Sequence, residues 1–265
     1  MSNLPGFFVI LLLLAGFTAA SAQAHTPYLA PATYDIPRSG WVTLDASFAD
    51  HFFVPEVVFD DSEFRVLGAD GQWGHPATVH RLKTRAVIEH LLDEKGTYRF
   101  STGTRHGAVF RFYELNGERE ALRSADEPLP EGAVLLDHFQ AVTLAETYLT
   151  LGAPTRAALK PHGQGLEVVA DTHPNDVYHG EALRVRVLFE GEPLPEQELQ
   201  LFAAGGGDDK AVLTAKAGAD GYAELAPLQA GVYLMRARHR APAPAGAAAP
   251  HYSYTYTLAF EVAEQ

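Results

Sequence analysis

Apolar and polar positions alternate over short stretches of this chain, which is the pattern of half-buried β-strands. In the first half such stretches cover residues 41–48, 63–67, 97–101, 108–115 and 141–151, and many are rich in Val, Phe, Tyr and Thr. Turn-forming pairs separate them, and Asn116-Gly117 directly after one stretch is typical of a tight hairpin. Residues 85–92 fit a strand or a short helix by periodicity alone. We therefore expect the first half to be built of strands.

A second series of strands follows a stretch rich in Pro and Gly at residues 152–165. Its members cover residues 166–170, 182–190, 199–203, 211–215, 222–225, 231–238 and 252–262, roughly at the 8–12-residue spacing of a sandwich. The pattern predicts an all-β protein with two β-sandwich domains, residues 25–155 and 165–265, of which the second is immunoglobulin-like or transthyretin-like. Residues 205–209 and 241–250 are expected to form flexible loops.

The amino-terminal segment has the layout of a secretory signal peptide. An apolar run over residues 7–20 precedes the small-x-small site Ala22-Gln23-Ala24. The segment before the run lacks Lys and Arg, so an uncleaved anchor is the rival interpretation, but the run is shorter than the roughly 20 residues of a spanning helix. We expect residues 1–24 to be removed after Ala24, which places the mature protein in the periplasm and makes His25 its first residue.

Composition narrows the chemistry. The 265 residues carry a formal net charge of −13, which disfavours binding to nucleic acid or anionic lipid because their phosphates would be repelled. There are no cysteines, so disulfides, thiolate metal sites and cysteine nucleophiles are excluded, and an exported protein without disulfides fits a bacterial periplasm. All 12 histidines follow the predicted cleavage site, and imidazole suits nickel, cobalt, copper or zinc.

His25 is the principal candidate ligand. A histidine at a free amino terminus offers both its α-amine and its ring Nδ1, which can close a chelate ring on one metal ion. Pro27 has no backbone N–H, so successive deprotonated amides cannot extend the chelate beyond Thr26, and the common square-planar amino-terminal motif is absent. The alternative is that His25 has no metal-binding role, because cleavage by signal peptidase exposes one residue after its site whatever that residue is.

Three further histidines are candidate metal ligands: His51, His173 and His179. His51 follows a predicted strand and has carboxylates nearby, although an exposed loop position would explain it equally. His173 and His179 lie with Asp171 and Asp176 in the densest His/Asp cluster of the chain. That cluster also contains Pro174 and Asn175, so ordinary turn chemistry is the competing explanation.

Several segments together resemble a family of bacterial periplasmic proteins with a domain of unknown function, described as related to nickel or cobalt uptake. They are HTPYLAP from residue 25, SFADHFFVPEVVF at 47–59, the stretch 165–195, ADGYAEL, QAGVYLMRARH and YSYTYTLAFEV. The resemblance covers nearly the whole mature chain. It implies a two-part β-sandwich, a periplasmic location and an accessory role beside metal uptake, in some cases near a TonB-dependent receptor. Of the family's positions, only the initial histidine carries over, as His25.

No motif for catalysis is present: the sequence has no G-x-S-x-G, H-E-x-x-H, P-loop or dinucleotide-binding G-x-G-x-x-G. A copper oxygenase that uses His25 in a histidine brace is a minor alternative. The main hypothesis is a non-enzymatic periplasmic protein that binds a transition-metal ion or metal chelate for an uptake system, with an inner-membrane permease or TonB-dependent receptor as partner. Its metal affinity is expected to fall below about pH 6.5, because protons compete for imidazole. The alternative is an envelope interaction module that docks to an outer-membrane receptor or transporter.

Overall fold

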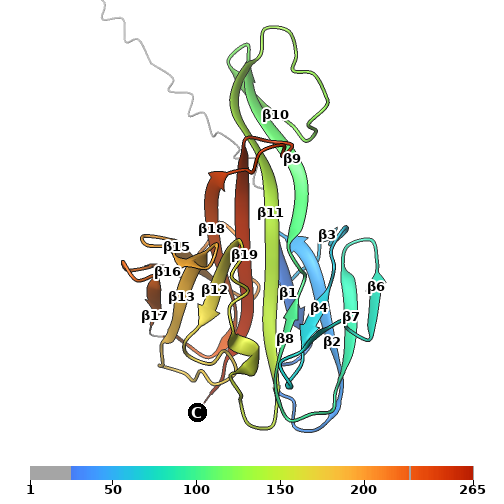
Figure 1. Cartoon of the computed structure of the whole chain (residues 1–265), viewed down its shortest axis with the longest axis vertical. Coiled ribbons are helices and arrows are strands. Elements are labelled where there is room, and N and C mark those ends of the chain that lie inside the picture. The colour runs from blue at the N-terminus through green and yellow to red at the C-terminus, as the bar shows by residue number, and fades with distance from the viewer. Residues whose placement is uncertain (1–24, 227, 265) are drawn as a thin grey trace, which may run out of the picture.

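The computed structural model describes residues 25–226 and 228–264, and regular structure there is β apart from one 3-10 turn, η1 (Ala157–Leu159) (Figure 1). The strands before this turn are β1 (Thr26–Pro31), β2 (Gly40–Ala49), β3 (Val57–Val58), β4 (Arg65–Leu67), β5 (Trp73–Gly74), β6 (Thr78–Arg81), β7 (Ala86–Leu92), β8 (Gly96–Ser101), β9 (Arg105–Leu115), β10 (Glu118–Leu122) and β11 (Val134–Leu151). Those after it are β12 (Leu166–Ala170), β13 (Leu183–Phe189), β14 (Glu192–Pro193), β15 (Glu198–Ala203), β16 (Leu213–Lys216), β17 (Tyr222–Leu225), β18 (Gly231–Pro242) and β19 (His251–Val262). Within the described ranges, no helix has the length and apolar character needed to cross a membrane. The predicted signal peptide lies outside them.

Ten strands form a central sheet that contains strands of both halves of the chain. Its path is β16-β15-β18-β19-β11-β8-β4-β5, with β9 paired to β11 and β10 paired to β9. The halves meet at the parallel pair β11–β19, in register from Gln140 opposite Tyr252 to Thr147 opposite Ala259. The predicted boundary at 152–165 lies between β11 and β12, but strands from both sides of it share this sheet. The division into domains 25–155 and 165–265 stays a prediction.

Two smaller sheets cover the two faces of the central sheet. The five-stranded sheet β1-β2-β7-β6, with β3 beside β2, packs on the face that carries Ala145 and Leu149. The four-stranded sheet β12-β13-β14, with β17 beside β13, packs on the face that carries Leu144 and Tyr148. Side chains alternate between the faces of a strand, so β11 supplies apolar groups to both cores. The all-β class predicted from the sequence, with packed sheets, is confirmed.

One buried charge network crosses the middle of β11. The Glu146 side chain is fully buried and accepts hydrogen bonds from Arg99 Nη2 at 2.5 Å and Tyr256 Oη at 2.9 Å, and its other oxygen lies 2.8 Å from His162 Nε2. Burial alone would raise the pKa of Glu146, but the Arg99 charge and the contact with His162 outweigh it and lower the pKa to about 2. This carboxylate is therefore ionised in the folded protein at neutral pH.

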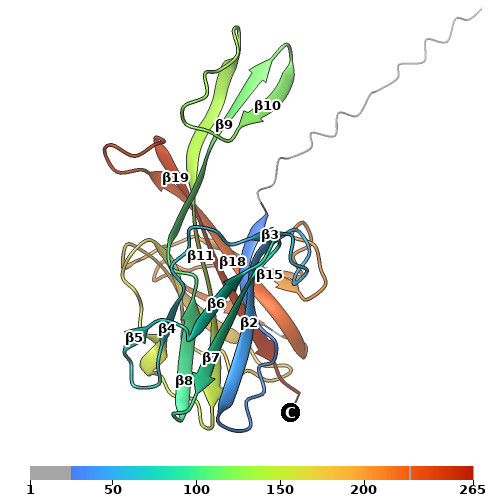
Figure 2. The same cartoon turned by 90° about the vertical axis from the view of Figure 1, so that its right-hand side faces the viewer.

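A hairpin arm projects from the body of the molecule, formed by β9, β10 and the start of β11 (Figures 1 and 2). Its turn is Asn116-Gly117, where both residues have positive φ, 55° and 83°, so the tight hairpin expected there is confirmed. The arm also explains why β11 begins at Val134 rather than at residue 141. Those first residues pair with β9 outside the buried core, so they lack the buried apolar pattern on which the prediction relied.

The remaining strand predictions agree with the fold. Residues 85–92, which fitted either a strand or a helix, contain strand β7. The ladder of β18 and β19 flanks the Ala/Pro-rich loop, as expected. Residues 205–209 connect β15 and β16, but they do not form the freely flexible loop that was expected, because Asp208 is buried among polar partners described below.

Candidate metal centre

The register of the first two strands brings His25 to Asp50. In the β1–β2 ladder Thr26 lies opposite Ala49, so the next pair outward along the two chains is His25 and Asp50. The chain then turns back into β3, and the backbone N–H of Glu56 donates to the carbonyl of Phe48 at 3.4 Å. Three side chains separated by up to 31 positions in sequence are thereby collected at one end of the five-stranded sheet.

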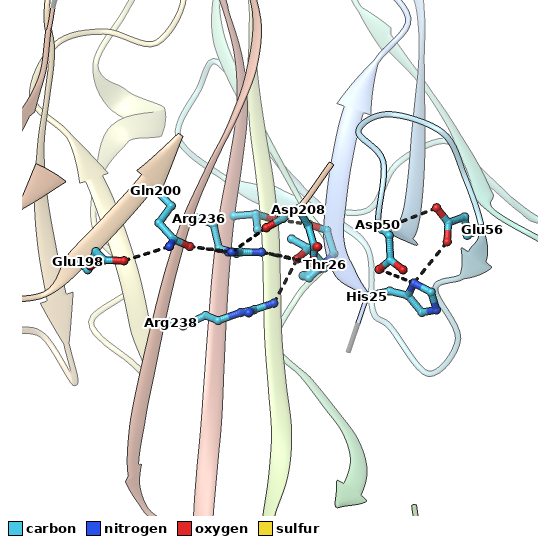
Figure 3. Close-up of polar contacts among 11 residues, drawn as sticks. His25, Thr26, Asp50, Glu56, Glu198, Gln200, Asp208, Arg236 and Arg238 are labelled. Atoms are coloured by element: carbon cyan, nitrogen blue, oxygen red, sulfur yellow. Dashed lines mark hydrogen bonds and ion pairs between the residues drawn. The ribbon is translucent and has the colours of Figure 1, made fainter. Parts of the chain in front are cut away.

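The three side chains form a compact histidine–carboxylate cluster (Figure 3). His25 Nδ1 lies 2.8 Å from Asp50 Oδ1 and 3.4 Å from Glu56 Oε2, and one ligand atom from each residue lies within 4.8 Å of the others. All three residues are half-buried. The backbone N–H of Asp50 donates to the second oxygen of Glu56 at 3.1 Å, which fixes that carboxylate in place. One ring nitrogen thus faces two carboxylates, although it can carry only one proton.

A buried network anchors the residue that follows His25 (Figure 3). Thr26 is fully buried, and its hydroxyl accepts hydrogen bonds from Arg236 Nη1 at 2.8 Å and Arg238 Nη2 at 3.2 Å. The same hydroxyl donates to Asp208 Oδ2 at 3.3 Å. A hydroxyl has one proton and two lone pairs, so these three contacts use its whole capacity. The start of β1 is therefore fixed to β18 of the central sheet.

The network also ties residues 205–209 to the turn that holds the cluster. Asp208 and Arg236 are each 4% exposed and form an ion pair at 3.6 Å. The backbone N–H of Asp208 donates to the carbonyl of Asp50 at 2.8 Å, and Phe52 donates to Gly206 at 2.9 Å. Burial raises the pKa of Asp208, and burial together with the neighbouring Arg238 lowers the pKa of Arg236 to about 10, so Arg236 stays charged at neutral pH.

The other histidines predicted from the sequence lie apart from this cluster. His51 is exposed and its backbone pairs with Gly207, while its neighbour Asp50 is the residue that faces His25. His179 is exposed on the loop before β13. The structure does not bring these two histidines together with His25, and their role as metal ligands stays a prediction.

His173 is engaged in hydrogen bonds at both ring nitrogens. Its Nε2 lies 3.0 Å from Thr97 Oγ1 and 3.1 Å from the carbonyl of Thr155, and its Nδ1 lies 3.1 Å from the donating N–H of Asn175. The side chain is buried, and this burial lowers its pKa. The contact with Asn175 is of the kind that the turn interpretation expects, and the role of His173 as a metal ligand stays a prediction.

Reasoning from the sequence did not select Asp50, Glu56, Asp208 or Arg236 as site residues. Asp50 and Glu56 were visible only as carboxylates near His51. Knowing that Thr26 pairs with Ala49 would have identified Asp50 as the neighbour of His25. The alternation of apolar residues predicts which side chains share a face of a strand, but it does not predict which strand is the partner or in what register the two strands pair.

A groove of about 410 Å³ includes His25 in its lining and extends over β9, β11, β18 and β19. Phe110, Phe112 and Phe139 form one wall, with nearly parallel rings and centroids 5.4–6.4 Å apart. Of the three residues of the cluster, His25 lines this groove, and Asp50 and Glu56 do not.

These features define an all-β protein of packed sheets with a histidine–carboxylate cluster at the start of its first strand. The chain belongs to a protein family described as a domain of unknown function (DUF4198), whose family model matches residues 22–241. That description names neither a metal nor a transport role. A search for relatives among curated proteins finds no match.

Three solved structures are distantly similar to the chain. The chain is similar to the D0-D1 domain of intimin at 13% identity and a TM-score of 0.22, covering 88% of this chain and 96% of that one. It is similar to a tetra-tandem repeat from the extending region of a large adhesion protein at 12% identity and a TM-score of 0.23, covering 90% of this chain and 49% of that one. It is also similar to the chicken CNTN1 FN1-FN3 domains at 10% identity and a TM-score of 0.25, covering 90% of this chain and 98% of that one. Likenesses this weak carry no argument about function.

Proposed function

We propose that this chain is an exported, non-catalytic protein that binds a divalent transition-metal ion, of the nickel or cobalt type, through His25, Asp50 and Glu56. It would serve as a binding or accessory protein for uptake of that metal or its chelate, beside an inner-membrane permease or a TonB-dependent receptor. The observation that carries this proposal is the position of His25 Nδ1, 2.8 Å and 3.4 Å from two carboxylates.

The choice of ring nitrogen supports the proposal. If cleavage occurs after Ala24, the α-amine of His25 is free, and Nδ1 is the ring nitrogen that can close a six-membered chelate ring with it. Two carboxylates complete a mixed nitrogen and oxygen donor set of the kind that nickel, cobalt, copper and zinc accept. The two negative charges also balance a dication, whereas a proton on Nδ1 balances only one of them.

The proposal is tested by calorimetric titration of Ni(II), Co(II), Cu(II) and Zn(II) into mature protein that begins at His25. We expect stoichiometric binding that is lost when one alanine is added before His25 and weakened at least about tenfold in Asp50→Asn. His179→Ala is a matched control, because it removes an exposed histidine outside the cluster, and it should bind as the parent does. Equal weak binding by all these proteins would overturn the proposal.

A second candidate function is an envelope interaction module, and the hairpin arm favours it. Val134, Leu135 and Leu136 are consecutive, and their side chains are exposed by 62%, 45% and 50%. Consecutive exposed aliphatic residues are unusual on a soluble surface and often mark a protein contact. Replacing all three by Ser should abolish co-purification with an outer-membrane receptor if this function is correct, while leaving metal binding at His25 unchanged.

A further inference from the structure

The groove of about 410 Å³ is lined both by the body of the molecule and by the hairpin arm (Figure 2). Its lining combines residues of β1, β2 and β3 with residues of β9, β10 and β11. Phenylalanine side chains occur on both sides, Phe48 from β2 and Phe110, Phe112 and Phe139 from β9 and β11. Small-molecule sites usually have a volume of about 300–1,000 Å³ and a mostly apolar lining. The groove therefore has the size and the apolar surface of such a site.

Three of these side chains, Phe110, Phe112 and Phe139, form a wall of aligned rings that we call the phenylalanine wall. The ring plane of Phe110 makes an angle of 10° with that of Phe112 and of 25° with that of Phe139. Aromatic groups prefer offset stacked or edge-to-face contacts, so a flat group can extend this arrangement. The wall thus favours a ligand with a flat apolar body.

Positive charge lies over the phenylalanine wall, although the chain as a whole has a formal net charge of −13. The Arg119 guanidinium lies 4.8 Å from the ring centroid of Phe112, and the Arg123 guanidinium lies 5.4 Å from the ring centroid of Phe110. The two centroids are 6.4 Å apart, so the two guanidinium groups lie over adjacent rings. Their position over aromatic rings holds these planar donor groups beside the apolar surface.

Neither guanidinium has a carboxylate partner among the described residues, although Glu114 lies across the β9–β10 ladder from Arg119. The single carboxylate of the groove lining, Asp137, is bound by Arg240, whose Nη1 donates to it at 2.8 Å. The pKa of Asp137 is lowered mainly by Arg240, and the charge of Arg119 adds to the effect. The positive charge of Arg119 and Arg123 is therefore available to an anion from outside the chain.

We propose that the groove binds a small organic carboxylate with a flat apolar body. The body stacks on the phenylalanine wall, and the carboxylate is bound by the guanidinium groups of Arg119 and Arg123, whose planar donors match its geometry. The inference goes beyond the proposed metal binding and does not depend on it, because Asp50 and Glu56 do not line the groove. It gives the arm a part in ligand binding.

The test measures the affinity of mature protein beginning at His25 for four probes by calorimetry, in EDTA so that no metal takes part. The first probe, 2-naphthoate, has a flat body and a carboxylate. The second, 2-naphthamide, keeps the flat body and has no charge. Acetate has the carboxylate alone, and octanoate has a carboxylate on a flexible aliphatic chain.

The variant is Arg119→Gln with Arg123→Gln, which replaces two exposed side chains and leaves the phenylalanine wall in place. The matched control is Arg184→Gln with Arg186→Gln, because those two arginines also lie over an aromatic ring, that of Tyr222, and do not line this groove. The affinity for 2-naphthamide reports in each protein whether the wall is intact.

We expect the parent and the control to bind 2-naphthoate at least about tenfold more tightly than 2-naphthamide, acetate or octanoate. The Arg119/Arg123 variant should bind 2-naphthoate at least about tenfold more weakly than the parent and bind 2-naphthamide as the parent does. If the variant binds 2-naphthoate as the parent does, or if 2-naphthamide binds as tightly as 2-naphthoate, the arginines have no such role and the inference is overturned. Equal affinity for octanoate and 2-naphthoate would overturn the flat body.

The outcome for this groove is separable from that for the metal site. If 2-naphthoate does not bind while the parent, without EDTA, still binds Ni(II), the inference fails and the proposed function stands. If 2-naphthoate binds as expected and Ni(II) does not, the proposed function fails and the inference about the groove is supported.

Discussion

The hydroxyl of Thr26 anchors the residue next to His25, and its removal gives a testable prediction. Thr26→Val keeps the shape and the β-branch of the side chain, so the packing of β1 is preserved. It removes one acceptor that serves two arginines and one donor that serves Asp208. Water cannot replace these contacts easily, because Thr26 is fully buried and Arg236 is 4% exposed.

The cost of this change follows from the partners that lose a hydrogen bond. Leaving a buried polar group without a partner costs about 1–3 kcal/mol, and more when the group is charged. Arg236 keeps two contacts with Gln200 Oε1, at 3.2 Å and 2.7 Å, and its ion pair with Asp208, which limits the loss at that residue. We expect Thr26→Val to lower the free energy of unfolding by about 2–4 kcal/mol.

Urea unfolding measures this cost, and calorimetry with Zn(II) on the same samples measures the effect on the cluster. Metal affinity should fall about tenfold or more, as is typical when a group that positions a ligand is removed. Thr26→Ser is the control, since it keeps the hydroxyl and loses one methyl group worth about 1 kcal/mol. If Thr26→Val unfolds at the urea concentration of the parent, or if the Ser variant is as unstable as the Val variant, the reasoning about this network is refuted.

Three further predictions concern acid stability, the carboxylates and the arm. The pKa of Glu146 is about 2 in the folded protein, below its usual 4.5, so its stabilising effect is complete above about pH 4.5 and is lost as the pH falls toward 2. The free energy of unfolding, measured in urea at several pH values, should therefore decline over that range. Glu146→Gln leaves Arg99 buried without its counter-ion, so this variant should be about 3–5 kcal/mol less stable than the parent at pH 7. The stability of the variant should also change less between pH 4.5 and pH 2 than that of the parent. Glu56→Gln should weaken Zn(II) binding at least about tenfold by calorimetry, and unchanged affinity would remove Glu56 from the site. Gly117→Ala should destabilise the β9–β10 turn by about 1 kcal/mol, because φ at this position is 83° and a residue with a side chain is strained there. Hydrogen exchange should show faster exchange of backbone amides in the arm and unchanged exchange elsewhere.

The sequence predicted most of the longer strands, because local alternation and turn pairs indicate them, but it did not predict β1, β6 or β10. Strand β7 and the Asn116-Gly117 hairpin are examples. It did not predict that β11 and β19 pair in parallel at the centre of one sheet, since strands more than 100 residues apart leave no local signal of their pairing. The same limit applies to Asp50, whose approach to His25 depends on the register of β1 against β2.

The candidate site was predicted in one residue of three. His25 was selected because of its place after the predicted cleavage site, a chemical argument that needs no fold. The segment 205–209 was misjudged for the opposite reason: three successive glycines favour a flexible loop, yet Asp208 within it is buried by contacts with Thr26 and Arg236 that lie far away in sequence. Local composition cannot predict a hydrogen bond or an ion pair with a residue on a strand that is distant in sequence.

The most direct measurement of the central claim is a crystal structure of mature protein beginning at His25, soaked in Zn(II), with anomalous diffraction recorded at the zinc edge. The account predicts one strong anomalous peak at about 2.0–2.2 Å from His25 Nδ1 and from carboxylate oxygens of Asp50 and Glu56. A peak at His51, His173 or His179 in its place, or no peak at His25 at a saturating zinc concentration, would contradict it.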